Sequence, residues 1–521
     1  MSTIPENTDY DVLIVGGSVA GTSFASLLKE RRPDTRIAVV EQSRMFTRRV
    51  GEATVEVSGA FLSRFLGLYD HLSRHHLPKH GLRYWFTDGP HRSLGEMTEV
   101  GGRDLPHLPS FQLDRSKLDE HLLQRAQELG CEVLRPTQVL DVEHDWPVQR
   151  VRLRGEDGAE RALTARWVID ASGRRTFLAR KNRLKTRVEE HPVSAVWARW
   201  RNVADLDQPG FLPADPQVLP TSRRLATNHF CGYGWWVWVI PLSGGETSIG
   251  LVYDKTLFKP PGQGPLRPRY EEFLRNQPGL RELLADAEVD DDDFMAYSHL
   301  PYRSSHYMGR GWALVGDAAS FIDPYYSPGL DHLAISVYAT VQQVARELEG
   351  DLPGETLDEA IAEHNGNFER SYDRWLKALY QGKYELLGDA ELVAASFLVD
   401  TSLYYMAVVT PVIRDRDALR LPMFGLGIPQ TRYAYRTMQA FKRRLIHLAR
   451  FRRKVGTYGR RNAEEKIFTR AFGLGLFGSW RPLTLGLRIW IRLELERLFH
   501  SVLRPRIASK TEASRQAAVG S

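Results

Sequence analysis

A glycine-rich turn near the start of the chain contains the residue types that bind a pyrophosphate. Residues 16–21 read GGSVAG and include Gly16, Ser18, Ala20 and Gly21. A glycine at the first position permits a tight turn, the last glycine lets a helix approach a strand, and free amides at the helix N-terminus attract phosphate. Glu41 follows Gly21 by twenty residues, the offset at which a carboxylate accepts hydrogen bonds from a ribose. Ser18 stands where the usual fingerprint has its second glycine.

The segments around this turn must form two parallel strands joined by a helix if the turn is to hold a dinucleotide. Residues 11–15, DVLIV, predict a buried strand, and residues 22–32 predict a helix. Residues 36–40 predict a second strand that ends at Glu41. This order predicts a dinucleotide-binding unit, which by itself is equally compatible with FAD and with NAD(P).

Two further apolar runs end in small residues, at 167–173 (WVIDASG) and at 312–317 (WALVGD, which includes Gly316 and Asp317). Each alone is also typical of an ordinary strand–helix junction. In this order they resemble the FAD-binding pattern of the flavoprotein monooxygenases, which implies that Asp317 contacts the ribityl chain and that Arg115 lies near the flavin and the pyrophosphate. No second glycine-rich unit for NAD(P)H is found, so we expect electrons from a separate NAD(P)H-dependent flavin reductase or from transient docking of the nucleotide.

Three more motifs follow one another along the chain and are more specific. They are residues 51–54 (GEAT, with Glu52 and Ala53), 236–241 (WVWVIP, with Trp236, Trp238 and Pro241) and 321–329 (FIDPYYSPG). Over residues 8–350 the sequence resembles the flavin-dependent halogenases, whose W-x-W-x-I-P and F-x-x-P-x-x-S-x-G motifs are both complete here. The resemblance implies that FAD, as FADH2, uses O2 and chloride or bromide to make hypohalous acid, which halogenates an electron-rich aromatic ring.

The same resemblance places the lysine that carries the family's chemistry at Lys79, in residues 77–84 (LPKHGLRY). An ammonium can hydrogen-bond hypohalous acid and a neutral amine can form a haloamine. Apolar surroundings lower the pKa of a lysine and make both species accessible. An ordinary solvated lysine is the alternative. The resemblance also implies an internal tunnel for the oxidant, and it assigns to Trp236, Trp238 and Pro241 the separation of flavin from substrate.

Two residues depart from the family pattern. Tyr326 stands where tryptophan halogenases carry a glutamate that helps to remove the ring proton. Because a phenol activates its own ring, this change favours a phenolic or pyrrolic substrate over free tryptophan, and Tyr326 is our second catalytic candidate. Family halide sites use backbone amides of the S-x-G turn, and Pro328 has none. The candidate halide site is therefore Ser327, Gly329 and Leu330, with weaker halide binding or loss of halogenation as the alternative.

These features predict an α/β protein with a glutathione-reductase-type FAD-binding Rossmann fold, an inserted β-sheet substrate domain and a helical C-terminal region. The predicted FAD-binding parts are residues 1–85, 112–185 and 300–350. The predicted substrate domain comprises residues 86–111 and 186–299, and the C-terminal region comprises residues 351–521. Helices are predicted at 330–349, 357–387, 390–409, 432–453 and 483–503. Apolar residues alternate within 485–493, so a strand is the alternative for part of that last segment.

Positive charge is concentrated near the end of the chain. The 521 residues have a formal net charge of +6, yet residues 440–511 contain 18 lysines and arginines against four carboxylates. This basic segment indicates a local surface for an anionic partner, and it does not indicate a nucleic-acid-binding protein. It is compatible with a solvated helical lid, with a dock for an acidic carrier protein that presents an aromatic acyl group, and with anionic lipid contacted by Trp490 and neighbouring arginines.

Composition excludes several other classes of protein. Hydrophobic residues make up 42% and charged residues 26%, as in a globular protein. Two cysteines exclude a disulfide framework and fit a reducing cytoplasm. We expect no signal peptide, no membrane-spanning helix and a cytoplasmic location, peripheral to the inner face of the membrane if lipid is the partner.

We also expect no metal site at His71, His75, His76 and His80, because no carboxylate or cysteine completes a ligand set.

The sequence therefore predicts an FAD-dependent halogenase of secondary metabolism that acts on a phenolic or resorcinol-like ring, either free or tethered to an acyl carrier protein. One alternative is a flavin-dependent monooxygenase or reductase of the same fold. The other is a flavin-containing accessory protein at a membrane, with a vestigial site. Oxygen consumption with reduced FAD separates the two enzymes from the accessory protein, and a halogen in the product separates the halogenase from the monooxygenase.

Overall fold

The first sheet of the computed structural model is built around β1 (Tyr10–Val15), whose apolar residues are buried as expected of a central parallel strand. The structure describes residues 8–91, 93–211, 221–423, 429–463 and 465–503. β1 pairs in parallel with β2 (Ile37–Val40) and β10 (Glu160–Asp170), and β10 pairs in parallel with β20 (Trp312–Leu314). The predicted strands and their junctions are confirmed, and α1 (Val19–Arg31) follows the glycine-rich turn. The eight-stranded sheet is completed by β7 (Glu132–Leu134), β8 (Thr137–Asp145), β9 (Val148–Gly155) and β19 (Met308–Gly309).

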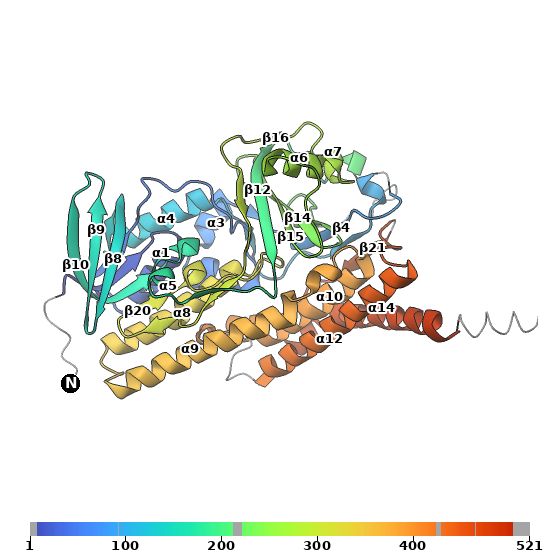
Figure 1. Cartoon of the computed structure of the whole chain (residues 1–521). Helices are drawn as coiled ribbons and strands as arrows, with labels where there is room; N and C mark the ends of the chain where they lie inside the picture. Colours follow the sequence, from blue (N-terminus) through green and yellow to red (C-terminus); the bar gives the residue numbers. More distant parts are fainter. Residues whose placement is uncertain (1–7, 92, 212–220, 424–428, 464, 504–521) are drawn as a thin grey trace, which may run out of the picture.

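A second sheet of nine strands stands beside the first and has β14 (Trp235–Pro241) near its centre (Figure 1). β14 pairs antiparallel with β13 (Thr227–Gly232) and β15 (Thr247–Asp254), and β15 pairs antiparallel with β12 (Val193–Arg201). Both faces of β14 are buried, so the sheet carries protein on each side. Its other strands are β4 (Leu82–Phe86), β5 (Glu99–Gly102), β16 (Glu288–Val289), β17 (Met295–Tyr297) and β21 (Lys466–Thr469).

Two predicted domain boundaries differ from the structure. The boundary at residue 85 falls inside β4, a strand of the second sheet, because residues 82–86 continue the pairing with β13 to the end of the strand. The C-terminal region is not purely helical, since β21 adds a parallel strand beside β5 at the sheet edge. Pairing over a separation of more than 360 residues leaves no signal in local sequence periodicity.

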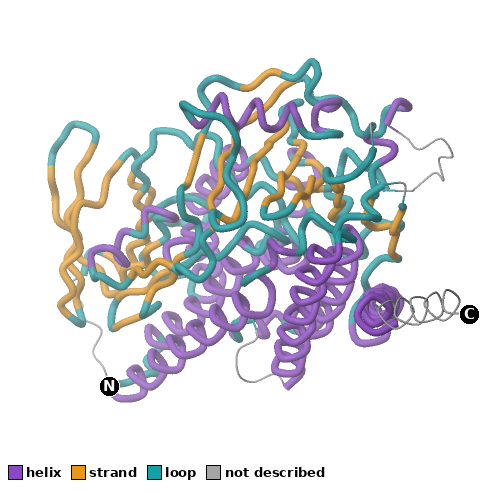
Figure 2. Tube along the Cα trace, turned by 45° about the vertical axis from the view of Figure 1, so that its right-hand side comes forward, coloured by secondary structure: helices purple, strands orange, loops and turns teal. Residues whose placement is uncertain are grey.

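The five longest helices form one layer beneath the two sheets (Figure 2). The layer contains α8 (Gly329–Leu348), α9 (Glu355–Trp375), α10 (Ala390–Tyr404), α12 (Pro429–Val455) and α14 (Trp480–Leu498). These confirm that helices form in all five predicted segments, and the alternative of a strand for part of residues 483–503 was wrong. The helix predicted over 357–387 was too long, because the helical chain ends at Tyr380 and Gly382 has a φ of +77°. The remaining elements are α2 (Glu56–Ala60), α3 (Tyr69–His75), α4 (Arg115–Glu128), α5 (Phe177–Lys181), α6 (Leu266–Asn276), α7 (Leu280–Leu283), α11 (Thr410–Arg414), α13 (Gly475–Gly478), β3 (Leu77–Pro78), β6 (Phe111–Gln112), β11 (Lys185–Arg187) and β18 (Tyr302–Ser304).

The helical segment Ala390–Arg414, which includes α10, has the length and apolar composition of a membrane span, with a mean hydropathy of 1.7 in its most apolar window. It is the only such helix among the described residues, and 83% of that window is buried inside the fold. Gly486 lets α14 pack closely on it, because a Cβ there would lie 2.9 Å from Leu398 Cβ. The apolar composition is therefore that of a core helix, contacted by α12 and α14.

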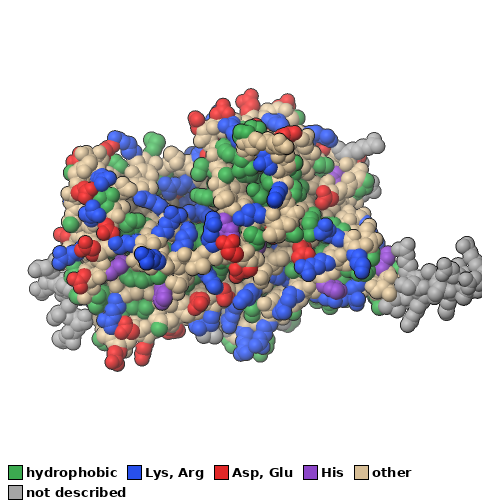
Figure 3. All heavy atoms as spheres, in the orientation of Figure 1, with side chains coloured by type: hydrophobic (Ala, Val, Ile, Leu, Met, Phe, Trp, Pro, Cys, Tyr) green, Lys and Arg blue, Asp and Glu red, His purple; other side chains and the backbone are tan. Residues whose placement is uncertain are grey.

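Much of the charge of the basic segment is neutralised by other parts of the fold. In the described part of this segment, eight arginines have a carboxylate partner. Buried Arg452 pairs with Asp389, Glu391 and Glu496, and two of these carboxylates come from outside the segment. Lysine and arginine side chains still gather at the lower edge of the molecule, where Figure 1 places α12 (Figure 3). Arg504, Arg506 and Lys510 lie outside the described residues.

Candidate active site

A first cavity opens at the carboxyl ends of β1, β2 and β10. Glu41, at the end of β2, is buried, and its carboxylate accepts hydrogen bonds from the Gly17 amide at 2.9 Å and the Ser43 amide at 2.8 Å. These bonds hold the carboxylate in place and leave acceptor capacity for a ribose. Arginines 49, 115, 174 and 175 also line the cavity, and their charges suit a pyrophosphate.

The two glycines of the turn are required for different reasons. Gly16 has φ +107°, and a Cβ there would lie 2.6 Å from the Ala171 carbonyl oxygen. Gly21 is not among the residues that line the cavity. A Cβ on Gly21 would lie 2.0 Å from the Gly16 carbonyl oxygen. Gly21 therefore shapes the turn from behind, whereas Gly16, Ser18 and Ala20 line the cavity.

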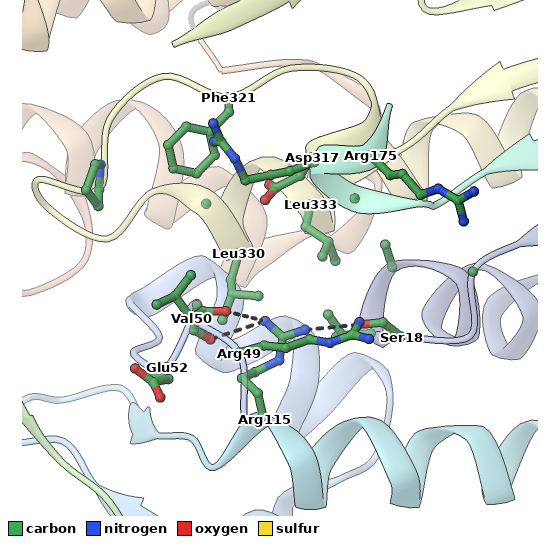
Figure 4. A pocket seen from close by; sticks show the side chains of 18 of the residues that line it. Ser18, Arg49, Val50, Glu52, Arg115, Arg175, Asp317, Phe321, Leu330 and Leu333 are labelled. Atoms are coloured by element: carbon green, nitrogen blue, oxygen red, sulfur yellow. Dashed lines mark hydrogen bonds between the residues drawn. The ribbon is translucent and has the colours of Figure 1, made fainter. Parts of the chain in front are cut away.

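Arg115, the first residue of α4, connects the glycine-rich turn to the 49–53 segment (Figure 4). Its guanidinium donates hydrogen bonds to the Ser18 hydroxyl at 3.1 Å and to the Val50 carbonyl at 3.1 Å. An ion pair with Asp119 at 3.1 Å, one helical turn further along α4, holds the side chain in position. Arg115 therefore fixes the wall of the cavity as well as lining it.

Asp317 and Phe321 lie across the cavity from Arg115 and Ser18 (Figure 4). Burial raises the pKa of the Asp317 carboxyl. Gly316 does not line the cavity; its amide donates to the Ser336 hydroxyl at 2.8 Å, and its φ of +57° turns the chain before α8. Gly316 thus positions Asp317 at the cavity wall.

Glu52 and Ala53 also line the first cavity. The Glu52 carboxylate forms an ion pair with Arg199 at 3.0 Å, and both side chains are buried. Desolvation nevertheless raises the pKa of Glu52 to about 7, against the opposing effect of Arg199. Glu52 can therefore present either an acid or a carboxylate to the cavity near neutral pH.

Lys79 lies in the wall of a second cavity. The side chain is 4% exposed, and its Nζ donates a hydrogen bond to the Thr54 carbonyl at 2.7 Å. Desolvation lowers the pKa of Lys79 to about 8, although Glu56 and Asp331 act to raise it. Both the ammonium and the amine are accessible near neutral pH, as the sequence predicted, and the alternative of a solvated lysine was wrong.

Two short segments line both cavities and form the wall between them. Along the 324–331 turn, Pro324, Ser327, Gly329 and Leu330 line the first cavity, whereas Tyr326, Pro328 and Asp331 line the second. Residues 51–53 line the first cavity and residues 54–56 line the second. Lys79 hydrogen-bonds to Thr54 in this wall, so its position is tied to the boundary between the two cavities.

Trp236 and Trp238 of β14 line the first cavity and do not line the second. The Trp236 ring lies 5.3 Å from the Tyr325 ring, which lies 4.5 Å from the Tyr326 ring in the second cavity. These three rings form a continuous aromatic barrier, so the indole is one layer of the separation and not the whole of it. Pro241, at the end of β14, lines neither cavity.

The candidate halide site lies at the start of α8, which begins at Gly329. Ser327, Gly329 and Leu330 all line the first cavity. The Ser327 amide is occupied, because it donates to the Pro324 carbonyl at 2.8 Å, while the Gly329 and Leu330 amides have no acceptor among the described residues. Tyr326 (φ +69°) and Ser327 (φ +55°) both adopt the left-handed backbone conformation. In this turn Tyr326 lines the second cavity and Ser327 lines the first.

Tyr326 is poorly suited to act as a base. Burial raises the pKa of its hydroxyl well above the usual value, and the hydroxyl donates to Asp400 at 3.3 Å. We therefore assign to Tyr326 a structural role, in which its ring shapes the second cavity and its hydroxyl forms a hydrogen bond within the cavity wall. The charged lining residues that our sequence analysis missed are Glu56, Asp104, Asp331, Asp400 and Arg470, and it also missed Lys383, which pairs with Asp400. Glu56 and Asp331 each lie two residues beyond a motif, whereas nothing in the sequence marks Lys383 or Asp400.

The histidines near Lys79 do gather, but not as a ligand set. His71 stacks on His121 with ring centroids 3.7 Å apart and lies 4.8 Å from His75. Within the described ranges no group of three His, Cys, Asp or Glu side chains is arranged to hold a metal ion. His80 instead accepts a hydrogen bond from the Ser222 amide and lines the second cavity.

Comparison with known proteins gives a consistent family assignment. A family model described as an FAD binding domain matches residues 9–365. Similar curated proteins include the flavin-dependent halogenase chlA of Dictyostelium discoideum (26% identical over 78% of this chain and 71% of chlA) and the sulochrin halogenase gedL of Aspergillus terreus (29% identical over 72% and 69%). A 1H-pyrrole-2-carbonyl peptidyl-carrier-protein chlorinase of Pseudomonas fluorescens is 29% identical over 62% of this chain and 72% of its own.

Solved structures share the fold over most of the chain. The halogenase PltM in complex with phloroglucinol and FAD has a TM-score of 0.69 at 19% identity, covering 86% of this chain and 92% of PltM. The flavin-dependent brominase Bmp2 has a TM-score of 0.60 at 20% identity, covering 84% and 99%.

Proposed function

The chain belongs to the FAD-binding domain family and is a flavin-dependent halogenase, and we propose that it replaces a ring hydrogen of a phenolic or resorcinol-like substrate with chlorine or bromine. One observation carries the proposal. A buried lysine of lowered pKa faces a second cavity that shares its wall with the cavity at the glycine-rich turn. This arrangement separates the place where an oxidant is made from the place where it is used.

The residues of the first cavity fit FAD. Glu41 would hold the ribose, Ser18 and Arg115 would border the pyrophosphate, and Asp317 would face the ribityl chain. When bound, reduced FAD supplies, with O2, the oxidation of halide to hypohalous acid. The free amides of Gly329 and Leu330 would hold the halide on the same side of the shared wall.

Lys79 would act on the other side of that wall. Its ammonium can hydrogen-bond hypohalous acid at Nζ and aim the halogen at a ring carbon, or its amine can carry the halogen as a haloamine. In either case the ring gains a carbon–halogen bond and loses a proton, and the oxygen leaves as water. Trp375, Leu379, Phe397 and Phe472 give the cavity the apolar walls that an aromatic ring requires and that exclude water.

A phenolic ring is favoured because Tyr326 is held protonated where a carboxylate would be needed for a less activated ring. Two similar proteins are consistent with a phenolic substrate. The relative gedL is a sulochrin halogenase, and the halogenase PltM was solved in complex with phloroglucinol, which is a phenol. The carrier-protein chlorinase supports a tethered substrate as the second candidate. We also expect a separate flavin reductase as the source of FADH2.

Incubation with a panel of free phenols, a flavin reductase, NADH, FAD and bromide or chloride tests the proposal. We expect products that gain one halogen, recognised by its isotope pattern in mass spectrometry, and no product without halide. A gain of one oxygen in place of halogen would identify a monooxygenase instead. Halogenation of carrier-bound acyl groups alone would reject the free phenol and favour the tethered substrate.

We further propose that the enzyme works in the cytoplasm and touches the inner face of the membrane through the surface of α13 and α14. Phe477, Trp480, Ile491, Leu495 and Phe499 are exposed there, and Phe477 is 85% exposed. Among the described residues, Arg481 and Arg488 on α14 have no carboxylate partner within ion-pair distance. Trp490, which we expected at the interface, instead packs on Phe441 of α12.

Vesicle co-sedimentation tests this contact. We expect salt-sensitive binding to anionic vesicles, because each well-placed cation contributes about 1 kcal/mol near such a surface. Replacing Phe477 and Ile491 by serine should weaken binding without changing halogenation of a soluble phenol. Equal, negligible binding of the wild type to anionic and neutral vesicles at low salt would eliminate the membrane contact.

A further inference from the structure

Glu56 brings a carboxylate to the second cavity, beside the segment that holds Lys79. It lies two residues beyond Thr54, whose carbonyl accepts the hydrogen bond from Lys79 Nζ at 2.7 Å. Two residues of extended chain span at most about 7 Å, so the Cα atom of Glu56 lies no further than this from that of Thr54. Glu56 and Lys79 line the same cavity. Desolvation lowers the pKa of Lys79, and Glu56 is the charged group that opposes this effect most strongly.

The two oxygens of the Glu56 carboxylate have different surroundings. Oε1 accepts a hydrogen bond from the Tyr405 hydroxyl at 2.8 Å, and Tyr405 also lines the cavity. Burial raises the pKa of Tyr405 well above its usual value, so this hydroxyl stays protonated and remains a donor. Oε2 accepts no hydrogen bond from the described residues, the side chain is half-buried, and this oxygen is not among the unbonded ones that are shut off from solvent. Glu56 therefore has one oxygen that is held in place and one that keeps accessible surface.

The other carboxylates that line the second cavity are already engaged. Asp331 is fully buried and accepts a hydrogen bond at each of its two oxygens. Asp400 and Asp104 each form an ion pair with a neighbouring cation. Glu56, by contrast, has no cation within ion-pair distance in the part of the chain that the structure describes. Glu56 is thus the carboxylate of this cavity with an oxygen free to take up a proton.

We infer that Glu56 is the catalytic base of the reaction: its Oε2 takes the proton that the ring carbon loses when it binds the halogen. The carbon–halogen bond forms as the halogen–oxygen bond of hypohalous acid breaks, and the oxygen leaves as water with a proton from the Lys79 ammonium. Glu56 then returns the ring proton to the Lys79 amine, so both residues regain their starting states. In sum, one ring hydrogen and one hypohalous acid give one carbon–halogen bond and one water. The inference rests on the proposed function and supplies the base that Tyr326 cannot provide.

The test compares ordinary and ring-deuterated resorcinol in single-turnover bromination by the complete enzyme with FADH2 and bromide. For the wild type we expect no primary isotope effect, because a base beside the ring carbon makes proton loss fast. Glu56→Gln keeps the size of the side chain and an oxygen for the Tyr405 hydroxyl, but it has no basic oxygen. It should introduce a primary isotope effect and slow bromination about tenfold. This is less than the roughly hundredfold that a positioned base supplies elsewhere, because a phenol activates its own ring.

The isotope effect separates a base from a charge that acts only through Lys79. Glu56→Gln also removes a charge that acts on the pKa of Lys79, so a lower rate by itself does not assign the role. A change in that pKa alters how hypohalous acid is held, and it does not alter the breaking of the carbon–hydrogen bond. Glu56→Ala is the second variant. Acetate contains the methylene carbon and the carboxylate that this substitution removes, so added acetate should restore the rate and abolish the isotope effect.

Glu359→Gln is the matched control. Glu359 is exposed on α9 and lines neither cavity, so this variant should retain the wild-type rate and show no isotope effect. FAD affinity and thermal unfolding verify that each variant is folded. Absence of an isotope effect in both folded Glu56 variants would overturn the assignment and leave the proposed function intact, whereas absence of brominated product with the wild type would reject the proposed function itself.

Discussion

Replacing Lys79 with methionine is expected to lower the rate of halogenation by at least about a hundredfold, within the range that positioned acid–base groups supply. The physical reason is that the buried Nζ is the group in the second cavity that can hold hypohalous acid or carry its halogen. Methionine keeps the length and apolar stem of the side chain, so the cavity should retain its shape. Single-turnover assays with FADH2, bromide and a phenol would measure the loss.

Two readouts separate a catalytic role of Lys79 from a structural one. The Lys79→Met enzyme should bind FAD with wild-type affinity and consume O2 at the wild-type rate, because Lys79 does not line the first cavity. Hypobromous acid should then escape into solution, where a dye that it brominates detects it. Halogenation of the phenol at the wild-type rate would show that Lys79 is not the catalytic lysine.

The same substitution should stabilise the fold near neutral pH. The pKa of Lys79 falls from 10.5 in the unfolded chain to about 8 in the fold, so burial of the ammonium opposes folding by about 3 kcal/mol below pH 8. Between about pH 8 and pH 10.5 the unfolded chain binds more protons than the folded one, and wild-type stability therefore rises with pH. Chemical denaturation should show the advantage of Lys79→Met shrinking over that window; a pH-independent difference would contradict the buried ammonium.

Replacing Gly21 with valine is expected to weaken FAD binding by at least about tenfold. The smallest side chain at this position already places its Cβ 2.0 Å from the Gly16 carbonyl oxygen, which is backbone and cannot rotate away. The turn must therefore shift, and with it the amides at the start of α1 that would face the pyrophosphate. Fluorescence titration of apoenzyme with FAD measures the affinity directly, even if the wild type binds oxidised FAD weakly.

Gly210→Val is the matched control for this prediction. A Cβ on Gly210 would meet no atom of the described residues within 4 Å, and Gly210 does not line the first cavity, so FAD affinity should not change. Circular dichroism would establish that Gly21→Val retains its secondary structure. Wild-type FAD affinity in a folded Gly21→Val protein would reject the assignment of residues 16–21 as the dinucleotide turn.

The amino-acid sequence alone determined the features that depend on local pattern. The DVLIV strand, the glycine-rich turn and the carboxylate of Glu41 are close in sequence, and their spacing is dictated by the length of one strand–helix–strand unit. The five helices of the C-terminal region were predicted from the same kind of local periodicity, although the alternation of apolar residues in 485–493 proved to be a helix with buried Ile489 and Leu493. Lys79 and the halide turn came from motifs, which are also contiguous.

Tertiary structure decided everything that depends on distant segments meeting. It showed that the residues of the 324–331 turn divide between the two cavities, and that Gly21 supports the glycine-rich turn from behind. It paired Arg452 with Asp389 and Glu391, which lie outside the basic segment. The net positive charge of residues 440–511 therefore overstates the positive charge on the protein surface. It also brought Lys383, Tyr326 and Asp400 together. Hydrogen bonds and ion pairs act over a few ångströms in space, and sequence separation carries no information about them until the fold brings the groups into contact.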